Sequence, residues 1–586
     1  MKYTLTLLLF YIISGLATCL GQSGEFPAPP GDLVLNNKEE VFIHYNSTFL
    51  LAGESLYYKF YCLDPDTGKL KDLSKVGYLE LTGEDGSRVF LHKISLENGS
   101  GYGDFLIPST VPSGSYKILG YTRWMKNAGK DHFFKGDLVV VNPYMEDQSR
   151  IIKVEDSNQA STISVSQQDP SEERNINSNN NYSLNTNGES FGKRERVRIA
   201  INKLNNGSVP GNFSLSVKKA EEFEIPQVLQ ATTYRSLYQS SNWNSGSNVI
   251  LPDLRGQVIT GKLKGIDGVV DTGGRSVVFS LPGKPFFIRI AKTAADGSFL
   301  FNVETRNFGS TAYLQVLGKE KDKFEIILDE VPMIQKENLE FEKFRVTPSI
   351  VDHIRERSIY NQVENSYKAV KQDSIIPEGP SVPFYGSLPE MYDLDAYTRF
   401  PTLQETFLEI IQLARISRNR DGTSQFEMVS GTGASGLKSL LIVDGLIVQD
   451  HENFVDFDAR RIKSIGLQRK EYYLGPEVFK GLIAVETING EFLSSLNRNF
   501  IKSEDFQNFQ FKKEYFQPPY QSAEDRNSRV PDYRLQLLWQ PVVEVKDSRT
   551  EIEFYTSDVP GKYEIILEGF TENGDAVSLK KVINVE

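Results

Sequence analysis

The chain has 586 residues, a net charge of −12, two cysteines and five histidines. This length predicts several domains of roughly 100–200 residues each. The acidic balance, without a basic stripe interleaved with aromatic residues, argues against nucleic acid as a partner. The many Phe and Tyr residues favour β-strands, in which flat side chains pack well on the pleated surface.

Residues 1–21 have the pattern of an export signal, with a charged start, an apolar run and small residues before the cleavage point. The run falls short of the roughly 20 apolar residues of a membrane-spanning helix, so a membrane anchor is the less favoured alternative. The residues around Cys19 resemble a bacterial lipoprotein box, from which Thr18 departs. We expect cleavage after Gly21, with lipidation of Cys19 as the alternative. Cys62 then remains without a partner for an internal disulfide.

Residues 31–143 contain short, often alternating strand patterns that Pro, Gly, Asn and Asp separate, which predicts a β-sandwich. The stretches LLAGESLYYKFYCLD and NGSGYGDFLIPSTVPSGSYKILGYTRWM resemble the second macroglobulin domain of bacterial alpha-macroglobulins. Family members that trap proteases carry a Cys-Gly-Glu-Gln thioester. Cys62 lies in a different sequence, so the resemblance does not extend to that chemistry.

Residues 144–190 are rich in Ser, Asn, Gln and charge, and they predict a polar linker that cannot bury enough surface to fold. Residues 191–222 then offer two strands around a Gly/Pro turn. They predict part of a second macroglobulin-like sandwich.

Residues 252–344 predict a third β unit, with Asp296-Gly297 at a hairpin corner. The stretch TAADGSFLFNV resembles the transthyretin-like regulatory domain found beside carboxypeptidases, which implies a spacer or contact module rather than a catalyst. In residues 345–394 the apolar side chains recur at approximately helical spacing, which predicts a helical linker.

A helix is also predicted just after residue 400, where Thr402 and Glu405 form a capping-box pair. Such a helix more often packs on a sheet than binds a partner. Its expected apolar face consists of Leu403, Phe407, Ile410, Ile411 and Ala414.

Three glycines, Gly431, Gly433 and Gly436, satisfy the G-x-G-x-x-G pattern of nucleotide-binding loops. Such a loop needs a helix after it, whose free N–H groups hold the phosphate. Here Leu437 intrudes before Lys438, and the following SLLIVDGLIV run predicts a buried strand and a turn. We therefore expect the glycines to connect two strands and to bind no nucleotide.

Residues 395–492 resemble the plug domain of TonB-dependent outer-membrane receptors. The resemblance depends on the strand that ends in Asp444-Gly445, the I-x-x-I of Ile462–Ile465, and the Gly-initiated strand at Gly481. In a receptor the plug precedes a barrel of about 22 strands, and the residues after Phe492 are too few for one. The resemblance implies a plug-like domain that stands alone or fits a channel made by another protein.

Residues 530–586 predict a C-terminal β-sandwich with a hairpin turn at Glu572–Asp575. The whole order resembles exported envelope proteins of Bacteroidota. The predicted fold class is mainly β and multi-domain: tandem Ig-like or macroglobulin-like and transthyretin-like sandwiches plus a small α+β plug-like domain.

The sequence predicts no catalytic residue, no cofactor and no metal ligand. A solvated loop is the favoured interpretation of Asp456 and Asp458, because the oxygen pattern of a calcium loop is incomplete there. No nucleophile motif accompanies the histidines, so an enzyme with an unrecognised site is the least favoured hypothesis. The five histidines lack metal-ligand spacing and are His44, His92, His132, His353 and His451.

These observations favour a non-catalytic, exported envelope protein, periplasmic or associated with the outer membrane, without a membrane-spanning segment in the mature chain. We expect it to bind outer-membrane or periplasmic proteins, including a β-barrel channel, through the plug-like domain. The alternative is a glycan- or peptide-binding sandwich that uses exposed aromatic residues such as Tyr121 and Trp124. For those two side chains a packing role is the preferred interpretation.

Overall fold

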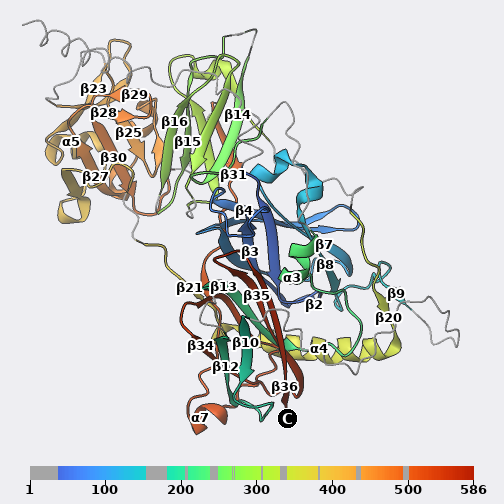
Figure 1. Ribbon diagram of the computed structural model, residues 1–586. Coiled ribbons are helices and arrows are strands. Elements are labelled where there is room, and N and C mark those ends of the chain that lie inside the picture. The colour runs from blue at the N-terminus through green and yellow to red at the C-terminus, as the bar shows by residue number, and fades with distance from the viewer. Residues whose placement is uncertain are drawn as a thin grey trace, which may run out of the picture.

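The structure is a computed structural model in which strands dominate and form four modules (Figure 1). The predicted class, mainly β and multi-domain, is confirmed. The predicted export signal over 1–21, Cys19 and the three loop glycines lie outside the described residues. The structure describes residues 37–153, 181–204, 209–237, 249–266, 268, 271–284, 286–304, 308–329, 339–379, 383–429, 437–492 and 500–586.

The N-terminal sandwich, residues 40–141, packs a three-stranded sheet on a five-stranded sheet. Its strands lie within the predicted domain 31–143, of which residues 31–36 are outside the described part. One sheet consists of β1 (Glu40–Tyr45), β3 (Ser55–Leu63) and β6 (Ser100–Leu106), and the other of β2 (Phe49–Leu51), β8 (Phe134–Val141), β7 (Gly114–Thr122), β4 (Val76–Gly83) and β5 (Arg88–Ser95).

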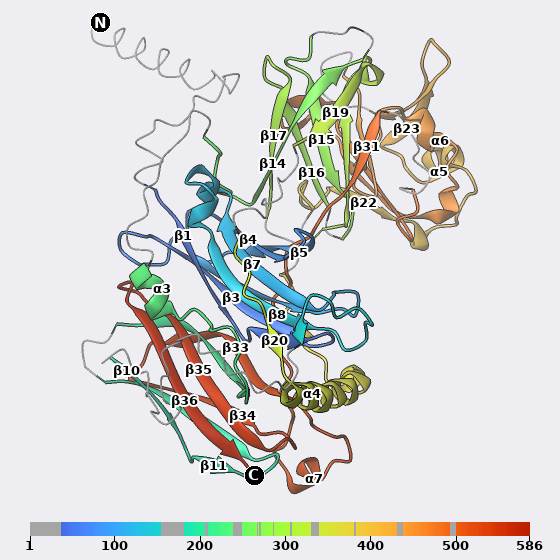
Figure 2. The ribbon, with the colours of Figure 1, turned by 90° about the vertical axis from the view of Figure 1, so that its right-hand side faces the viewer.

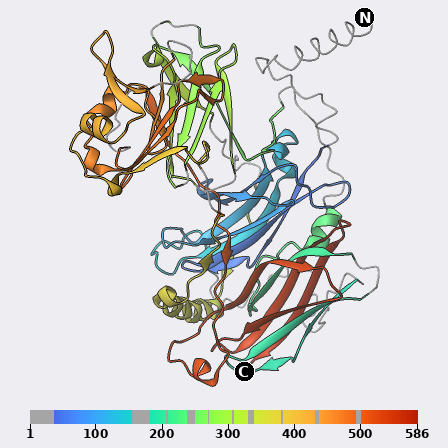
Figure 3. The ribbon, with the colours of Figure 1, turned by 90° about the vertical axis from the view of Figure 1, so that its left-hand side faces the viewer.

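The split sandwich is built from two distant parts of the chain, residues 182–219 and 536–585. The two separate domains predicted over 191–222 and 530–586 are therefore one module, because their strands share both sheets. Figure 3 shows their strands together in the module that contains the C-terminus. One sheet is β10 (Tyr182–Thr186), β12 (Arg196–Lys203) and β34 (Arg549–Tyr555), and the other is β11 (Ser190–Phe191), β36 (Ala576–Val585), β35 (Gly561–Thr571), β13 (Gly211–Lys219) and β33 (Gln536–Val545).

Two features of the split sandwich explain why it needs both parts. Strand β13 lies between β35 and β33, so its hydrogen-bonding partners on both sides come from the C-terminal part. Strand β10 falls inside the predicted linker 144–190, but Tyr182 and Leu184 alternate inward and are buried in the core. The polar linker therefore ends before Tyr182.

The middle sandwich spans residues 257–328 and is completed by one strand from after the α+β module, β31. Asp296-Gly297 forms the predicted turn, in which Gly297 has φ 82° and Asp296 accepts a hydrogen bond from the Ser298 N–H at 3.0 Å. The strands before and after this turn belong to different sheets, so it is a corner between the two sheets and not a hairpin. Its sheets are β17 (Ser298–Val303), β14 (Gln257–Gly265) and β19 (Phe324–Leu328), facing β16 (Phe287–Lys292), β15 (Ser276–Leu281), β18 (Thr311–Val316) and β31 (Ile501–Asp505).

The α+β module, residues 390–492, is a mixed five-stranded sheet with α5 (Leu403–Glu409) and α6 (Glu452–Val455) on one face. Thr402 caps α5 as predicted, accepting from the Glu405 N–H at 3.2 Å, but the helix ends before Ile410. The sheet order is β22 (Glu390–Asp393), β27 (Ile462–Gln468), β30 (Leu482–Thr487), β25 (Leu440–Val443) and β26 (Leu446–Ile447), with hairpins β23 (Ala414–Arg418)–β24 (Ser424–Met428) and β28 (Tyr472–Leu474)–β29 (Glu477–Phe479).

Helix α4 (Pro348–Ser366) is the helical part of the predicted linker 345–394. Figure 2 shows it below the N-terminal sandwich and beside the split sandwich. Its buried positions are Ile350, Ser358 and Asn361, so the buried face of the helix is partly apolar and partly polar. The remaining connecting elements are α3 (Ala231–Leu237), β9 (Ile152–Lys153), β20 (Arg345–Val346), β21 (Ser374–Ile375), β32 (Lys513–Glu514) and α7 (Ala523–Arg526).

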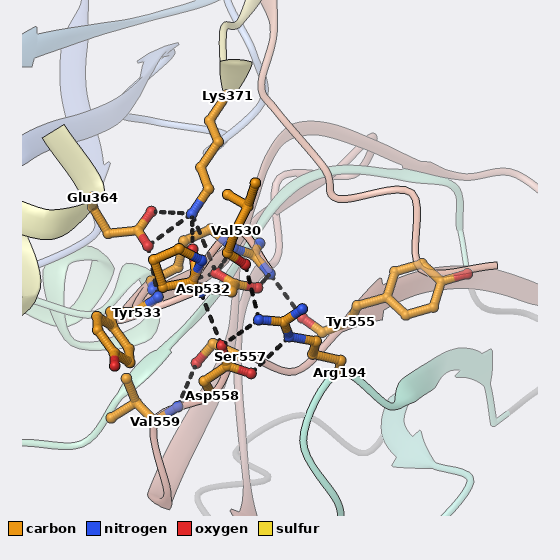
Figure 4. A network of polar contacts seen from close by, with 12 residues as sticks. Arg194, Glu364, Lys371, Val530, Asp532, Tyr533, Tyr555, Ser557, Asp558 and Val559 are labelled. Atoms are coloured by element: carbon orange, nitrogen blue, oxygen red, sulfur yellow. Dashed lines mark hydrogen bonds and ion pairs between the residues drawn. The ribbon is translucent and has the colours of Figure 1, made fainter. Parts of the chain in front are cut away.

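A polar network holds the C-terminal end of α4 to the segment that enters the split sandwich (Figure 4). Lys371 Nζ donates to both carboxylate oxygens of Glu364, at 2.8 and 2.9 Å, and to the Pro531 carbonyl at 2.8 Å. Beside it, Arg534 Nε donates to Asp532 Oδ1 at 2.7 Å. These charge-assisted bonds fix one end of the helix.

The N-terminal and split sandwiches meet through buried polar groups. Tyr61 Oη donates to the Glu568 carbonyl at 3.0 Å, and His44 Nδ1 lies 2.7 Å from Ser214 Oγ. The Glu568 carboxylate is also buried, and it accepts from Ser578 Oγ at 2.6 Å and from the Ala231 N–H at 2.9 Å. Burial raises the pKa of Glu568 to about 8.

We expect Glu568→Gln to remove a pH-dependent loss of stability. Below pH 4.5, the ordinary pKa, the carboxyl is neutral in both the folded and the unfolded chain. As the pH rises toward 8, only the unfolded chain ionises, so the free energy of unfolding of the wild type falls, by on the order of 4 kcal/mol. Urea titrations of both proteins from pH 4 to 9 measure this difference. A difference that stays constant over that range contradicts the prediction.

Candidate functional site

The histidines do not form a site. His44, His92 and His451 are buried in different parts of the molecule, and burial lowers their pKa values to about 3, 3 and 4. Each satisfies a local contact, as when His451 Nδ1 accepts from the Phe426 N–H at 3.0 Å. Among the described residues, no group of three or more His, Cys, Asp or Glu side chains could hold a metal ion. The other two histidines lie in the 3-10 helix η2 (Lys130–His132) and in α4.

Asp456 and Asp458 cap short helices. Asp456 follows the last residue of α6, and its backbone N–H donates to the Phe454 carbonyl. Asp458 accepts from the Arg460 N–H at 3.0 Å at the start of the next turn. The hydrogen bond from the Arg460 side chain lowers the pKa of Asp458 to about 2. The Asp458 carboxylate thus binds a backbone N–H and a guanidinium group.

Tyr121 and Trp124 provide no surface for a glycan, because they are 1% and 4% exposed. Tyr121 stacks between Tyr78 and Phe133, with ring centroids 5.5 and 4.6 Å away. The Trp124 indole N–H donates to the Asn37 carbonyl. Both therefore have the packing role that the sequence analysis preferred. Cys62 is likewise buried, and burial raises the pKa of its thiol.

The chain after the loop glycines continues as strand β25 and not as a helix. Ser439, within the Lys438-Ser439 pair, accepts from the Met428 N–H at 3.2 Å and donates to the Lys480 carbonyl at 3.0 Å. Asp444 and Gly445 follow with φ values of 49° and 85°, as a two-residue hairpin turn requires. The described residues that follow the glycines therefore do not begin the helix that a phosphate-binding loop requires.

Strand alternation makes the sheet of the α+β module the middle layer of three. In β30, Ile483 and Val485 face the core under α5 and α6, whereas Leu482 and Ala484 face the other way. That second face packs on β15 and β16 of the middle sandwich, and Gln315 Nε2 donates across to the Ile447 carbonyl at 2.9 Å. A strand buried on both faces explains the continuous apolar runs in the sequence.

Beyond this contact the same face opens into a groove of about 920 Å³, which we call the inter-module groove. Gly466 in β27 forms part of its wall, where Leu388 and Met391 pack against the bare backbone. An ion pair of 2.5 Å between Lys284 and Glu486 lies at the groove. The groove is mainly apolar, and four large apolar side chains along it are more than a third exposed: Ile375, Ile376, Met391 and Phe511.

An unpaired strand edge lies beside the groove. Among the described strands, β22 pairs with β27 on one side and has no neighbour on the other. Its Met391 is 58% exposed. An exposed edge with an apolar side chain can accept an added strand, whose side chains then enter an adjacent groove.

The groove is not predictable from the sequence, because its residues come from segments that are far apart in the chain. Ile375 and Ile376 lie in the linker before the α+β module, and Phe511 lies after β31. Apolar pairs within otherwise polar linkers were the available signal. Among the described residues, no helix is long and apolar enough to cross a membrane.

Comparison with solved structures finds neighbours at low sequence identity. No protein-family model matches the chain, and no curated protein matches its sequence. The chain is similar to a Salmonella alpha-2-macroglobulin reacted with methylamine, at 9% identity and a TM-score of 0.24, with 94% of this chain and 39% of that chain covered. It is also similar to an Escherichia coli alpha-2-macroglobulin activated by porcine elastase, at 10% identity and a TM-score of 0.23, with 94% of this chain and 44% of that chain covered.

A third neighbour is dimeric latent PorU from Porphyromonas gingivalis, at 10% identity and a TM-score of 0.16, with 53% of this chain and 34% of that chain covered. The chain spans about two fifths of the length of the two macroglobulins. Its neighbours among solved structures thus include bacterial macroglobulins and a PorU chain at low identity.

Proposed function

We propose that this protein is a non-catalytic, exported envelope protein that docks to an outer-membrane or periplasmic partner through its α+β module, the part of the chain that resembles a plug domain. The inter-module groove and the free edge of β22 carry the proposal. Together they present exposed apolar side chains next to unpaired backbone groups, which favours an extended apolar segment of a partner protein. The apolar contact between the α+β module and the middle sandwich supports the proposal, because it would transmit docking to the rest of the chain.

The groove favours a protein partner over a free small ligand because several of its large apolar side chains are exposed beside a strand edge without a neighbour among the described strands. Ile375, Met391 and Phe511 are 57%, 58% and 44% exposed. An added strand would bury them and pair its backbone with β22. We propose that the partner is an outer-membrane channel protein.

Photo-cross-linking in intact cells tests the proposal. With p-benzoylphenylalanine in place of Met391, we expect a discrete adduct that mass spectrometry identifies as containing an outer-membrane channel protein. The matched control replaces Leu408, which is in the same module and 74% exposed but lies outside the groove. Met391→Lys should abolish co-purification of the same channel. Equal adducts from both positions, or adducts without a channel protein, contradict the proposal.

A further inference from the structure

The free edge of β22 also indicates which kind of strand it accepts, an inference that rests on the docking function proposed above. Neighbouring side chains of a strand point to opposite faces of the sheet. Met391 and Asp393 therefore lie on the face of the inter-module groove, and Glu390 and Tyr392 lie on the face that α5 covers. An added strand meets a carboxylate at each end of β22 and a large, mainly apolar side chain at each position between them.

The two carboxylates of β22 have no cationic partner among the described residues. The Glu390 side chain makes no hydrogen bond or ion pair there, and Asp393 accepts only from the Asp395 N–H, at 3.1 Å. On the paired side of the strand they face Leu467 and Ser464 of β27, which are neutral. A strand added on the open side removes water from both carboxylates, which costs free energy unless that strand brings positive charges.

The surroundings of the edge are acidic as well. Among the described lining residues of the inter-module groove, Lys284 is the one basic side chain, and it pairs with Glu486 at 2.5 Å. Lys463 in β27 also lies 3.7 Å from Glu486. The groove and the edge together therefore present one ammonium group, that of Lys284, against the four carboxylates of Glu378, Glu390, Asp393 and Glu486.

A second copy of β22 does not suit this edge. Antiparallel pairing of all four residues about a twofold axis places Glu390 of each copy opposite Asp393 of the other. Like charges directly opposite each other destabilise a sheet, and the strand has no basic residue to offset them. The charges at this edge therefore favour a different chain over a second copy.

We infer that the edge of β22 accepts a strand of the partner protein in which two apolar residues lie between two basic ones. The basic residues lie opposite Glu390 and Asp393, and the apolar residues lie opposite Met391 and Tyr392. This order is the same in both chain directions, so it applies to a parallel and to an antiparallel strand. The side chain opposite Met391 faces the groove, the backbone bonds provide affinity, and the charges provide specificity.

Fluorescence anisotropy on the mature chain tests this inference with labelled peptides of about ten residues. The probe has Lys-Val-Val-Lys at the centre of a Ser/Thr host, and the matched peptides have Gln-Val-Val-Gln, Glu-Val-Val-Glu or Lys-Ser-Ser-Lys there. We expect the Lys-Val-Val-Lys peptide to bind about 2- to 30-fold more tightly than the Gln-Val-Val-Gln peptide, because it forms two cross-strand charge pairs. Salt should reduce this advantage.

A double substitution, Glu390→Gln with Asp393→Asn, removes both charges and keeps the side-chain shapes. Asn also keeps an oxygen that can accept from the Asp395 N–H. This variant should bind the Lys-Val-Val-Lys and Gln-Val-Val-Gln peptides equally well. The matched control is Glu409→Gln, at an exposed carboxylate at the end of α5, which should keep the full preference for the basic peptide.

Several results would overturn the inference. They are binding of none of the peptides, equal affinities of the wild type for the Lys-Val-Val-Lys and Gln-Val-Val-Gln peptides, tighter binding of the Glu-Val-Val-Glu or Lys-Ser-Ser-Lys peptide, and a wild-type dimer that cross-links through position 391. A channel adduct at position 391 without a preference for the basic peptide would refute this inference and leave the docking proposal intact. The preference without a channel adduct would refute the channel as partner and leave the inference intact.

Discussion

Deletion of residues 530–586 is expected to unfold residues 182–219, although nothing in that segment is changed. Strand β13 would lose β33 and β35, its partners on both sides, and β12 would lose β34. The buried side chains Phe213 and Leu215 would keep only β10 and β12 opposite them and would lose the core residues that the C-terminal part contributes. We expect hydrogen exchange in β13 to accelerate by about 1,000-fold or more, as it does when a whole cooperative unit opens.

A hairpin variant provides the control for that deletion. The Lys219 N–H donates to the Leu535 carbonyl at 2.8 Å, so the two parts of the split sandwich meet at this point. Replacing residues 220–534 by a short Asn-Gly turn should therefore give a continuous β13–β33 hairpin and keep the protection of β13. Protected amides in residues 182–219 after the deletion would show that the N-terminal part folds alone and would contradict the prediction.

Arg357→Ala is expected to cost about 3–5 kcal/mol of unfolding free energy, which is typical when one partner of a buried ion pair is removed. Arg357 Nε and Nη2 donate to the two oxygens of Glu54, at 2.7 and 2.8 Å, and Nη1 donates to Glu221. Nearby carboxylates hold the guanidinium pKa above its ordinary value, against the opposing effect of burial. Without Arg357 the two carboxylates would be left together in a buried place.

Arg355 is the matched control, because it lies on the same helix but its side chain is 70% exposed and pairs only with Asp352. Arg355→Ala should change the free energy of unfolding by less than about 0.5 kcal/mol. Urea titration measures both variants, and hydrogen exchange across α4 should accelerate only in Arg357→Ala. Similar effects of the two substitutions would show that the Arg357 ion pairs do not hold α4 in place.

Local features of the fold were predictable because their causes lie within a few residues. The turns at Asp296-Gly297 and Asp444-Gly445 follow from the tolerance of Asp and Gly for a positive φ. The start of α5 follows from the Thr402 cap. The strands of the N-terminal sandwich follow from short apolar runs between turn residues. In each case the determining interaction is local.

Long-range pairing was not predictable in the same way. Nothing in the spacing of residues specifies that Lys218 pairs with Gln536, because strand register over such a distance depends on packing of the finished core. The polar part of the buried face of α4 was not predictable for a related reason. Its buried Asn361 donates to the Ala52 carbonyl at 2.8 Å, and a pattern of apolar spacing cannot reveal such a contact. The inter-module groove was hidden in the same way, since its residues meet only after the modules pack.

The interrupted order of the split sandwich has a consequence for how the polypeptide matures. During synthesis the N-terminal sandwich can fold as soon as β8 has emerged, and the middle sandwich waits only for β31. Strand β13, in contrast, must stay without its partners until Gln536 and the residues beyond it exist. Closing so long a loop is slow, but prefolded domains inside it bring its ends together and reduce the entropy lost. The residues from Gln536 onward therefore complete the split sandwich, and a chain that stops before them leaves an open strand edge exposed to aggregation.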